Sequence, residues 1–432
     1  MIQPVVNKEA VRRAVIKVVG VGGGGVNAIN TMIAAGVKGV DFIAINTDVQ
    51  HLEGCLADQV LELAGLTQGM GAGGDPNKGR EAALQARESI ENLLRGANMV
   101  IITAVFGGGT GTGAATVVAE VARSLGILTV AVITLPFSRE GEVKMRDALE
   151  WLDTLKGSVD AYAVIPNDNL KKLAPRGTPS RKLLQLLDQY LGDTLTALVE
   201  LITHRAIINP DLNDVRAALQ NSGRFLIGVG LGEGEDRAEV AIQRALKNPL
   251  LENTDIRGAQ RGLIYIVQGP DGSDDEVDVV MNRLWEYLAR DARIKYGWDE
   301  NPQMEGRIAV TVILSNLNDI TDVDAASLVE VEELGARAYP LDSVGLTNFA
   351  ARPSLSDQAG LDRARAQRSG SRSLLNDARR PGVPDEAPEL NPIPAFMRAK
   401  GRDLRLHETS APSELGAYFT PGLPGSSEKR QV

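Results

Sequence analysis

The sequence has very little cysteine and histidine and lacks long apolar runs. Its 432 residues include one cysteine, Cys55, and three histidines. A lone cysteine excludes an internal disulfide and is typical of a reducing compartment. No Cys/His cluster has metal-ligand spacing, so we predict no protein-built metal site. No stretch approaches the ~18 apolar residues of a membrane span, and no signal peptide is evident at the N-terminus. We expect a cytoplasmic protein with no direct membrane insertion.

Positive charge is also in deficit, whereas glycine is in excess. The chain has 46 Lys and Arg against 56 Asp and Glu, a formal net charge of −10. Nucleic-acid binding depends on a basic surface, so no nucleic acid is expected as a partner. Of the 45 glycines, 16 lie in the windows 20–25, 65–79 and 107–113. The absence of a Gly-X-Y period excludes collagen, and 43% hydrophobic residues exclude a disordered glycine-rich polymer.

Short Val- and Ile-rich runs alternate with helical patterns over the first two hundred residues. The predicted strands are 15–19, 40–45, 59–63, 99–105, 128–134 and 160–165, and the predicted helices are 26–35, 78–95, 113–125 and 142–155. This alternation predicts an α/β fold with a Rossmann-like parallel sheet covered on both faces. Ligands bind at the carboxyl ends of such strands, and each glycine window follows a predicted strand.

A long helix over 180–203 is predicted from apolar residues at steps of three and four. These are Leu184, Leu187, Leu191, Leu195, Leu198 and Ile202. A second, smaller α/β domain follows at about 215–317, with strands at 224–230, 262–267 and 307–314 and helices at 236–246 and 274–290.

Beyond this domain, the segment 318–342 carries seven acidic residues and one arginine, and the segment 363–380 carries six arginines and one aspartate. These opposed charge blocks and the prolines of 381–394 predict a flexible linker.

Two glycine loops each follow a strand and open a helix. In the loop 20–27, bare backbone N–H groups can reach phosphate oxygens at a helix N-terminus. Alone, its Gly20, Gly22 and Gly25 also fit a dinucleotide fold with Asp48 as the ribose acid, or simply a tight strand–helix turn. The loop Gly107-Gly108-Gly109-Thr110-Gly111-Thr112-Gly113 makes a second phosphate nest. Two nests on neighbouring strands favour a triphosphate, and no P-loop motif is present.

GGGTGTG at 107–113 resembles the signature of the tubulin/FtsZ family. The wider resemblance, to FtsZ, covers about 12–317 and a short tail peptide. Its other matched segments are Asn46-Thr47-Asp48, Gly71-Ala72-Gly73-Gly74-Asp75-Pro76, Leu135-Pro136-Phe137, Ile165-Pro166-Asn167-Asp168 and Asn248-Pro249-Leu250-Leu251. The resemblance implies a polymerising GTPase of bacterial cell division that binds GTP or GDP with Mg²⁺ and acts at the mid-cell division ring during septation.

The resemblance also implies the nucleotide-binding residues. They are Gly22, Gly23, Gly24, Asn27, Asn46, Asp48, Gly73, Gly74, Gly107, Gly108, Gly109, Thr110, Gly111, Thr112, Gly113, Glu140, Lys144, Leu184 and Asp188. Glu140 would contact the ribose. Asp188 would read the guanine edge, where N1–H and N2–H₂ are adjacent donors that adenine lacks.

Asn209-Pro210-Asp211-Leu212-Asn213-Asp214-Val215 follows the long helix. The spacing of Asp211 and Asp214 fits a helix start capped by Asn209, and the segment is also similar to the family's catalytic loop, which assigns catalysis to Asn209, Asp211 and Asp214. From Asp188 to Asn209 is roughly 30 Å at ~1.5 Å per helical residue. If Asp188 contacts the base, the acids can only serve another subunit's nucleotide. Such a contact repeats head to tail into a filament.

The tail peptide Ile393-Pro394-Ala395-Phe396-Met397-Arg398 resembles the family's binding site for membrane-tethering division adaptors and assembly regulators. An ordinary proline-rich linker is the alternative.

The predicted organisation is a GTP-binding domain (1–179), a core helix and its connection to the catalytic loop (180–209), a C-terminal activating domain (210–317), a flexible linker (318–390), the partner-binding peptide (391–400) and a disordered tail (401–432).

Several residues depart from the family pattern. Leu184 stands where an aromatic ring usually stacks on guanine, and Lys144 stands where an arginine is usual. Lysine keeps the charge but not the bidentate fork. Two alternatives therefore stay open beside the GTPase: a non-hydrolysing scaffold paralogue, and a Rossmann-type NAD oxidoreductase built on Gly20–Gly25 and Asp48.

Overall fold

The computed structural model describes residues 14–175, 177–203, 206–246, 256 and 258–317. The linker, the tail peptide and Asn248–Leu251 lie outside the described residues. The first part contains β1 (Ile16–Val21), α1 (Gly22–Ala34), β2 (Asp41–Asn46), α2 (Val49–Glu53), β3 (Gln59–Glu62), α3 (Ala64–Thr67), α4 (Pro76–Gln85), α5 (Arg87–Leu94), β4 (Met99–Val105), α6 (Thr110–Ser124), β5 (Leu128–Leu135), α7 (Glu142–Lys156), β6 (Ala161–Pro166) and α8 (Asn167–Leu173). The second contains α9 (Ser180–Thr203), α10 (Leu212–Leu219), β7 (Gly223–Glu233), α11 (Arg237–Leu246), β8 (Ala259–Gln268), α12 (Asp274–Trp285), β9 (Leu288–Glu300) and β10 (Arg307–Ser315).

One ten-stranded sheet runs through both parts, in the order β3-β2-β1-β4-β5-β6-β7-β10-β8-β9. The strands from β3 to β7 are parallel, which confirms the predicted α/β class. β10 pairs antiparallel with β7 and β8, and β9 is parallel to β8. None of the helices in the described ranges is long and apolar enough to cross a bilayer.

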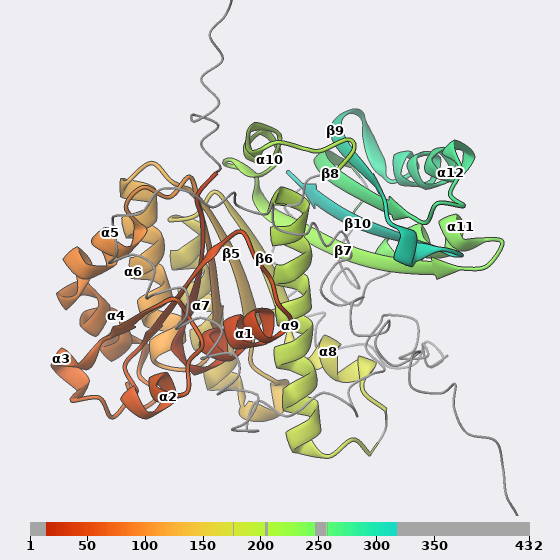
Figure 1. Cartoon of the computed structure of the whole chain (residues 1–432). Coiled ribbons are helices and arrows are strands. Elements are labelled where there is room, and N and C mark those ends of the chain that lie inside the picture. The colour runs from red at the N-terminus through yellow and green to blue at the C-terminus, as the bar shows by residue number, and fades with distance from the viewer. Residues whose placement is uncertain (1–13, 176, 204–205, 247–255, 257, 318–432) are drawn as a thin grey trace, which may run out of the picture.

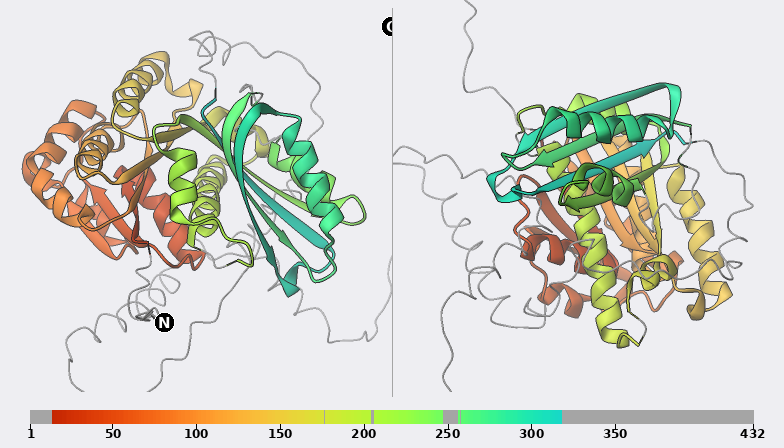
Figure 2. Two further views of the ribbon diagram at one scale, coloured as in Figure 1. Left: turned by 90° about the horizontal axis from the view of Figure 1, so that it is seen from above. Right: turned by 90° about the vertical axis from the view of Figure 1, so that its right-hand side faces the viewer.

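Helices cover both faces of the parallel strands because alternate strand residues point to opposite sides. On one face, Val18, Ile101 and Val130 pack with α1 and α9. On the other, Val19 and Ile102 pack with α4, α5, α6 and α7. Figure 1 shows these layers, and Figure 2 shows α9 between the red-to-yellow first part and the green-to-blue second part.

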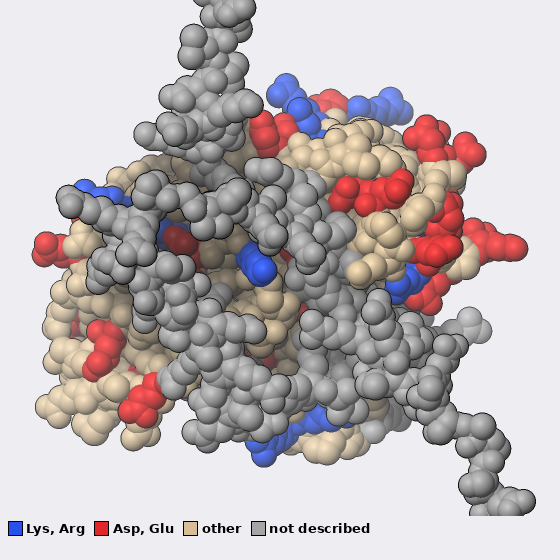
Figure 3. Space-filling model, viewed as in Figure 1, with Lys and Arg blue, Asp and Glu red and all other residues tan. Residues whose placement is uncertain are grey.

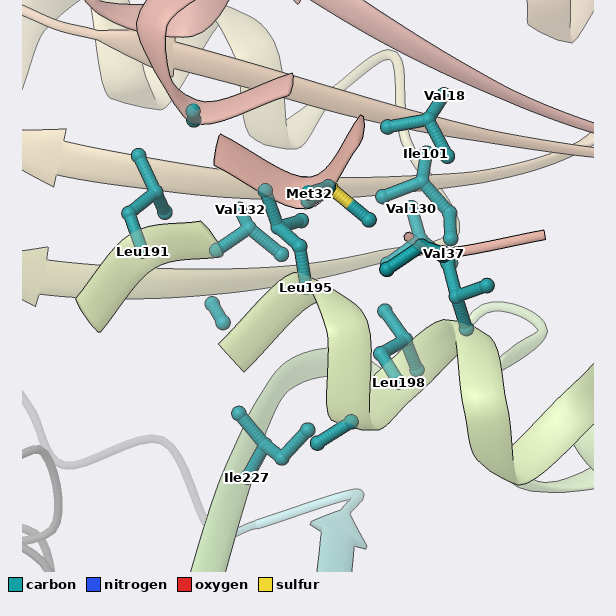
Figure 4. Close-up of a cluster of buried hydrophobic side chains, with 14 of the residues drawn as sticks. Val18, Met32, Val37, Ile101, Val130, Val132, Leu191, Leu195, Leu198 and Ile227 are labelled. Atoms are coloured by element: carbon teal, nitrogen blue, oxygen red, sulfur yellow. The ribbon is translucent and has the colours of Figure 1, made fainter. Parts of the chain in front are cut away.

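The long helix has the predicted bounds, 180–203, and joins the two parts through its apolar stripe. Leu191, Leu195 and Leu198 are buried against the parallel strands and β7, where Ile227 meets them (Figure 4). Leu184 differs from the prediction because its side chain is 52% exposed. The neighbouring Leu183 is buried in the core in its place.

Four predicted helices differ from the structure. α1 and α6 begin at Gly22 and Thr110, inside the glycine loops and earlier than predicted. β1 leads directly into α1, whereas residues 106–109 separate β4 from α6. Packing here overrides glycine's poor helix propensity. The predicted helix 78–95 is two helices that break at Ala86. The predicted helix 274–290 ends at Trp285, and its last residues begin the strand β9.

Two glycines let α4 pack closely on α6. A Cβ on Gly113 would lie 1.9 Å from the carbonyl oxygen of Pro76, and one on Gly79 would lie 2.4 Å from that of Gly109. Arg80 reinforces this contact by pairing with Glu120 at 2.8 Å. The clashing atoms are backbone, so they cannot move aside as a side chain would.

We expect Gly113→Ala to lower the free energy of unfolding by about 2 kcal/mol or more, because overpacking forces the backbone to shift. Chemical denaturation followed by circular dichroism measures this. Gly108→Ala is the matched control, since a Cβ on Gly108 meets nothing within 4 Å. Equal stabilities of the two variants would contradict the packing role of Gly113.

Candidate functional site

The three glycine windows meet at the carboxyl ends of β1, β2 and β4. A Cβ on Gly22 would lie 2.6 Å from the amide nitrogen of Gly111, so the first and third windows touch. The Gly71 N–H donates to the Thr47 carbonyl at 3.1 Å, which ties the second window to the loop after β2. A Cβ on Gly109 would lie 2.7 Å from the Cβ of Ala72, so the second window also touches the third.

A cavity of about 260 Å³ opens between the loops after β1, β4 and β5. It is lined by Val21, Gly23, Gly24, Val105, Phe106, Gly108, Gly109, Thr110, Gly111, Pro136, Glu140 and Lys144. The N-termini of α1 and α6 both lie at this cavity. Unpaired N–H groups and two positive helix-dipole ends make it suited to an anion such as a polyphosphate.

The glycines of the third window have two different surroundings. Gly109, Gly111 and Gly113 lie so close to neighbouring atoms that a side chain would clash. Gly108 has open space around it, as do Gly73 and Gly74, which have positive φ angles. Close packing therefore explains why residues 109, 111 and 113 are glycines, whereas Gly73, Gly74 and Gly108 leave backbone accessible to a ligand. Gly107 has φ +88° and lies against Pro136 and Lys144.

Hydroxyl groups tie the loops together. The Oγ1 atoms of Thr47 and Thr110 lie 2.5 Å apart, which links the loop after β2 to the start of α6. The Thr112 hydroxyl is buried and accepts the Gly107 N–H at 3.0 Å. Its oxygen thus closes the loop from within instead of pointing into the cavity.

The loop after β2 is held by its own polar side chains. Asn46 is buried, and its Oδ1 accepts the Thr47 N–H at 2.9 Å. Asp48 caps α2 by accepting the His51 N–H at 3.3 Å. The ring of His51 in turn meets the Gly23 carbonyl at 3.1 Å. Asn46 and Asp48 therefore shape the wall next to the first glycine window.

Glu140 and Lys144 form an ion pair at the mouth of the cavity. Burial alone would raise the pKa of Glu140. The hydrogen bonds from Lys144 and from the Phe137 N–H, with the charges of Lys144 and Arg139, outweigh that effect and lower the pKa. Glu140 is thus held as a carboxylate where the resemblance puts the ribose.

Asp188 faces α1 from the long helix. The Asn27 amide donates to its carboxylate at 3.3 Å, so two residues implied in nucleotide binding meet across α1 and α9. Burial raises the pKa of Asp188 to about 7, and the hydrogen bond from Asn27 only partly opposes this. Leu184, one helical turn earlier, presents a half-exposed apolar side chain. An apolar surface beside a carboxylate suits the face and edge of a base.

The acidic pair caps α10 in a way that differs from the prediction. The N-cap is Asp211, not Asn209. The Asp211 carboxylate accepts the Asp214 N–H at 2.8 Å, and the Asp214 carboxylate accepts the Asp211 N–H at 3.1 Å. This reciprocal pattern is a capping box, whose sequence signature has the acidic residue three positions after the cap. The exposed Asn209 precedes it.

The acids lie at the opposite end of the sheet from the glycine loops. Arg216, on α10, donates to the carbonyl of Asn98, the residue before β4, at 3.3 Å. The glycine loop 107–113 follows the other end of β4. Seven strand residues at ~3.3 Å each separate the two ends by about 23 Å. Figure 1 shows α10 at the upper end of α9, away from α2 and α3.

The strand β9, which the sequence analysis missed, positions the acidic loop. Ile208 exchanges two backbone hydrogen bonds with Trp298, at 3.0 and 2.8 Å. A Cβ on Gly297 would lie 2.6 Å from the Pro210 ring, so glycine lets the loop sit against the strand. The recurrence of Ile294, Tyr296 and Trp298 at every second position is the alternation that could have predicted this strand.

Comparisons with known proteins decide the family. A family model for the GTPase domain of the Tubulin/FtsZ family matches residues 15–175, and one for the C-terminal domain of the FtsZ family matches 223–318. The chain belongs to the FtsZ family. It is 42% identical over 310 residues to a cell division protein FtsZ of Aquifex aeolicus, covering 72% of this chain and 84% of that protein. It is 38% identical over 391 residues to that of Pseudomonas aeruginosa, covering 89% and 96%.

Solved structures agree with this assignment. An empty FtsZ dimer from M. jannaschii matches with a TM-score of 0.66 and 40% identity, over 70% of this chain and 88% of that one. A CetZ2 protofilament from Haloferax volcanii, at 19% identity and a TM-score of 0.61, shares the fold. The predicted family, its two-domain fold and its GTPase activity are confirmed. The NAD oxidoreductase alternative has no support.

If Asp188 recognises guanine, nucleotide affinity should rise with pH. The carboxylate must be ionised to accept the two guanine N–H groups, and a pKa of about 7 leaves it mostly protonated near pH 6. GDP affinity should therefore rise by up to about tenfold between about pH 6 and pH 8. Isothermal titration calorimetry measures this.

Asp188→Asn is the control, because it keeps the contact with Asn27 but cannot ionise. GDP should bind this variant weakly, and only the titration of its phosphate should remain in the pH profile. The same pH dependence in both proteins would rule out Asp188 as its source.

Proposed function

We propose that this FtsZ-family GTPase assembles head to tail, with Asn209, Asp211 and Asp214 of one subunit acting on the nucleotide of the next. The observation that carries the proposal is the placement of the acids and the glycine loops at opposite ends of β4. A subunit whose acids and phosphate loops lie near opposite ends of β4, which are about 23 Å apart, needs a neighbour to complete the site. The likeness to an FtsZ dimer supports self-association.

The bound nucleotide is GTP or GDP, held by the loops that line the cavity. The N–H groups at the starts of α1 and α6 would take the phosphates, with Gly108, Gly73 and Gly74 leaving backbone open. Glu140 would accept from the ribose, and Asp188 would read the guanine with Leu184 against its face.

Mg²⁺ fits this site only as a companion of the nucleotide. Over the described ranges, no three or more His, Cys, Asp or Glu side chains form a group that could hold a metal ion. Mg²⁺ prefers oxygen ligands and keeps several waters, so phosphate oxygens of the nucleotide and water would supply most of its ligands. When bound, it would neutralise phosphate charge.

Hydrolysis follows from the geometry of the acidic pair. The capping box fixes both carboxylates on the first turn of α10, so little reorganisation is needed when the next subunit arrives. Each carboxylate uses one oxygen within the box. Facing the next subunit's γ-phosphate, the pair would orient a water and accept its proton in an in-line attack. Assembly therefore precedes each turnover.

In the cell, the filament would act at the mid-cell division ring. The peptide 391–400, with Ile393, Phe396 and Met397 as its apolar anchors, would bind membrane-tethering adaptors and assembly regulators. It lies outside the described residues, so its sequence alone supports this role. The linker 318–390 would separate the peptide from the body of the filament.

We expect Asp214→Asn to keep GTP binding and lose turnover by roughly 100-fold or more, because proton transfer typically contributes at least that factor. Asparagine can still accept the Asp211 N–H, so α10 keeps its cap. Phosphate release and GTP affinity are measured on the same preparation. Asp274→Asn, an exposed acid on α12, is the control and should leave both unchanged. Weakened GTP binding or full turnover in Asp214→Asn would contradict the assignment.

A further inference from the structure

A cavity of about 520 Å³ lies between α10 and the neighbouring strands β8 and β9. Four of the residues that line it are cations: Arg216, Arg261, Arg293 and Lys295. Its lining also includes one acidic residue, Asp214. We call these four residues and the cavity the basic groove. Figure 3 shows blue side chains along the upper edge of the C-terminal part, above a right-hand flank that is mostly red. The positive groove is therefore a local feature of an acidic chain.

The cations of the groove are close enough to repel one another. Arg261 and Arg293 are register partners on neighbouring strands, and Lys295 follows Arg293 on the same face of β9. Like charges placed opposite each other across strands are destabilising. Arg261 is partly accounted for, because it donates to the carbonyls of Ala217 and Gln220 at 3.3 and 3.2 Å.

The remaining cations have less to balance them. Lys295 pairs with Asp214 at 3.0 Å, and its side chain is still 60% exposed. Arg293 is exposed at the surface. One carboxylate among four cations leaves a surplus of positive charge, so the groove suits an anionic occupant.

The chain itself carries an acidic segment, 318–342, that follows the last described residues, and β10 brings those residues close to the groove. β10 ends at Ser315, which is the register partner of Arg261. The Asn316 amide donates to the Gln260 side chain, which fixes the point where the chain leaves the sheet. The next acids are Asp319, Asp322 and Asp324. At ~3.3–3.6 Å per residue, the first of them is within about 14 Å of Ser315.

We propose that the acidic segment 318–342 docks in the basic groove of its own subunit. The segment has seven acidic residues and one arginine, which matches the surplus charge of the groove. Its attachment at the rim makes docking intramolecular, so a weak contact is favoured by a high effective concentration. The contact between exposed charges is sensitive to salt.

Docking has a consequence that rests on the proposed function. The groove contains Asp214, so an occupied groove covers the surface that must meet the next subunit's nucleotide. The acidic segment therefore competes with head-to-tail assembly, and its release favours filaments.

Carbodiimide cross-linking of the full chain tests the docking without GTP. The reagent joins a carboxylate to a lysine amine in direct contact, and Lys295 is the lysine of the groove. Mass spectrometry of digested protein should find Lys295 joined to carboxylates of 318–342 at low salt. The amount of this product should fall severalfold at about 0.5 M salt, where the Debye length is roughly 4 Å. The Lys295–Asp214 product, expected from the ion pair, is the internal reference.

Matched variants show whether the nearby charges matter. Asp319→Asn combined with Asp322→Asn and Asp324→Asn should lose the product severalfold, whereas Asp385→Asn with Glu386→Gln and Glu389→Gln should keep it. If Lys295 is joined to Asp214 alone, the proposal is overturned. This is the result expected if the acids of 318–342 pair instead with the arginines of 363–380. Links between ¹⁵N-labelled and unlabelled subunits would instead assign the groove to a second copy and overturn docking within one subunit.

Pelleting with GTP tests the consequence separately. The variant neutralised at 319, 322 and 324 should assemble at about a threefold lower protein concentration than the variant neutralised at 385, 386 and 389. Equal thresholds would contradict competition with assembly. Because cross-linking needs no nucleotide, failure of docking is distinguishable from failure of the proposed hydrolysis in trans.

Discussion

The rest of the structure depends on the close approach of two helix N-termini. α1 and α6 follow the neighbouring strands β1 and β4, and only glycine fits where they touch. A Cβ on Gly22 would lie 2.6 Å from the Gly111 nitrogen, and one on Gly111 would lie 2.7 Å from the Val105 carbonyl. Two positive dipole ends placed together are unfavourable unless an anion joins them. The packing of these two helix N-termini therefore creates an anion site.

This constraint separates the nucleotide loops from the acids proposed for catalysis. Because both helices start at the carboxyl ends of their strands, the nucleotide groups gather at that end of the sheet. The long helix α9 then takes the chain to the other end, where β9 holds the acidic loop through Ile208, Trp298 and Gly297. If the acids act on a neighbour's nucleotide, as proposed, a filament brings the two sites together. An anionic segment beside Asp214 would then affect assembly and hydrolysis together.

The sequence predicts the parallel sheet, α9 and the glycine windows well, because apolar periodicity and glycine clustering are strong local signals. It places the helix starts too late, since glycine's low propensity hides a first turn that is imposed by packing. It misses β9 because most of this strand is only partly buried, so few apolar residues mark its inner face. The meeting of Asn27 with Asp188, and the raised pKa of Asp188, arise from the packing of α1 on α9, which no local pattern encodes. The resemblance to a family implied the roles of these residues, and the fold gives the distances between them.

If one subunit's acids complete the next subunit's active site, GTP turnover per subunit must depend on protein concentration. Measured over a wide range of concentration, turnover should be almost absent below a threshold and rise above it, and sedimenting polymer should appear at the same threshold. Turnover per subunit that stays constant as the protein is diluted would rule out completion of the site by a neighbour, because an isolated subunit would then possess a complete site.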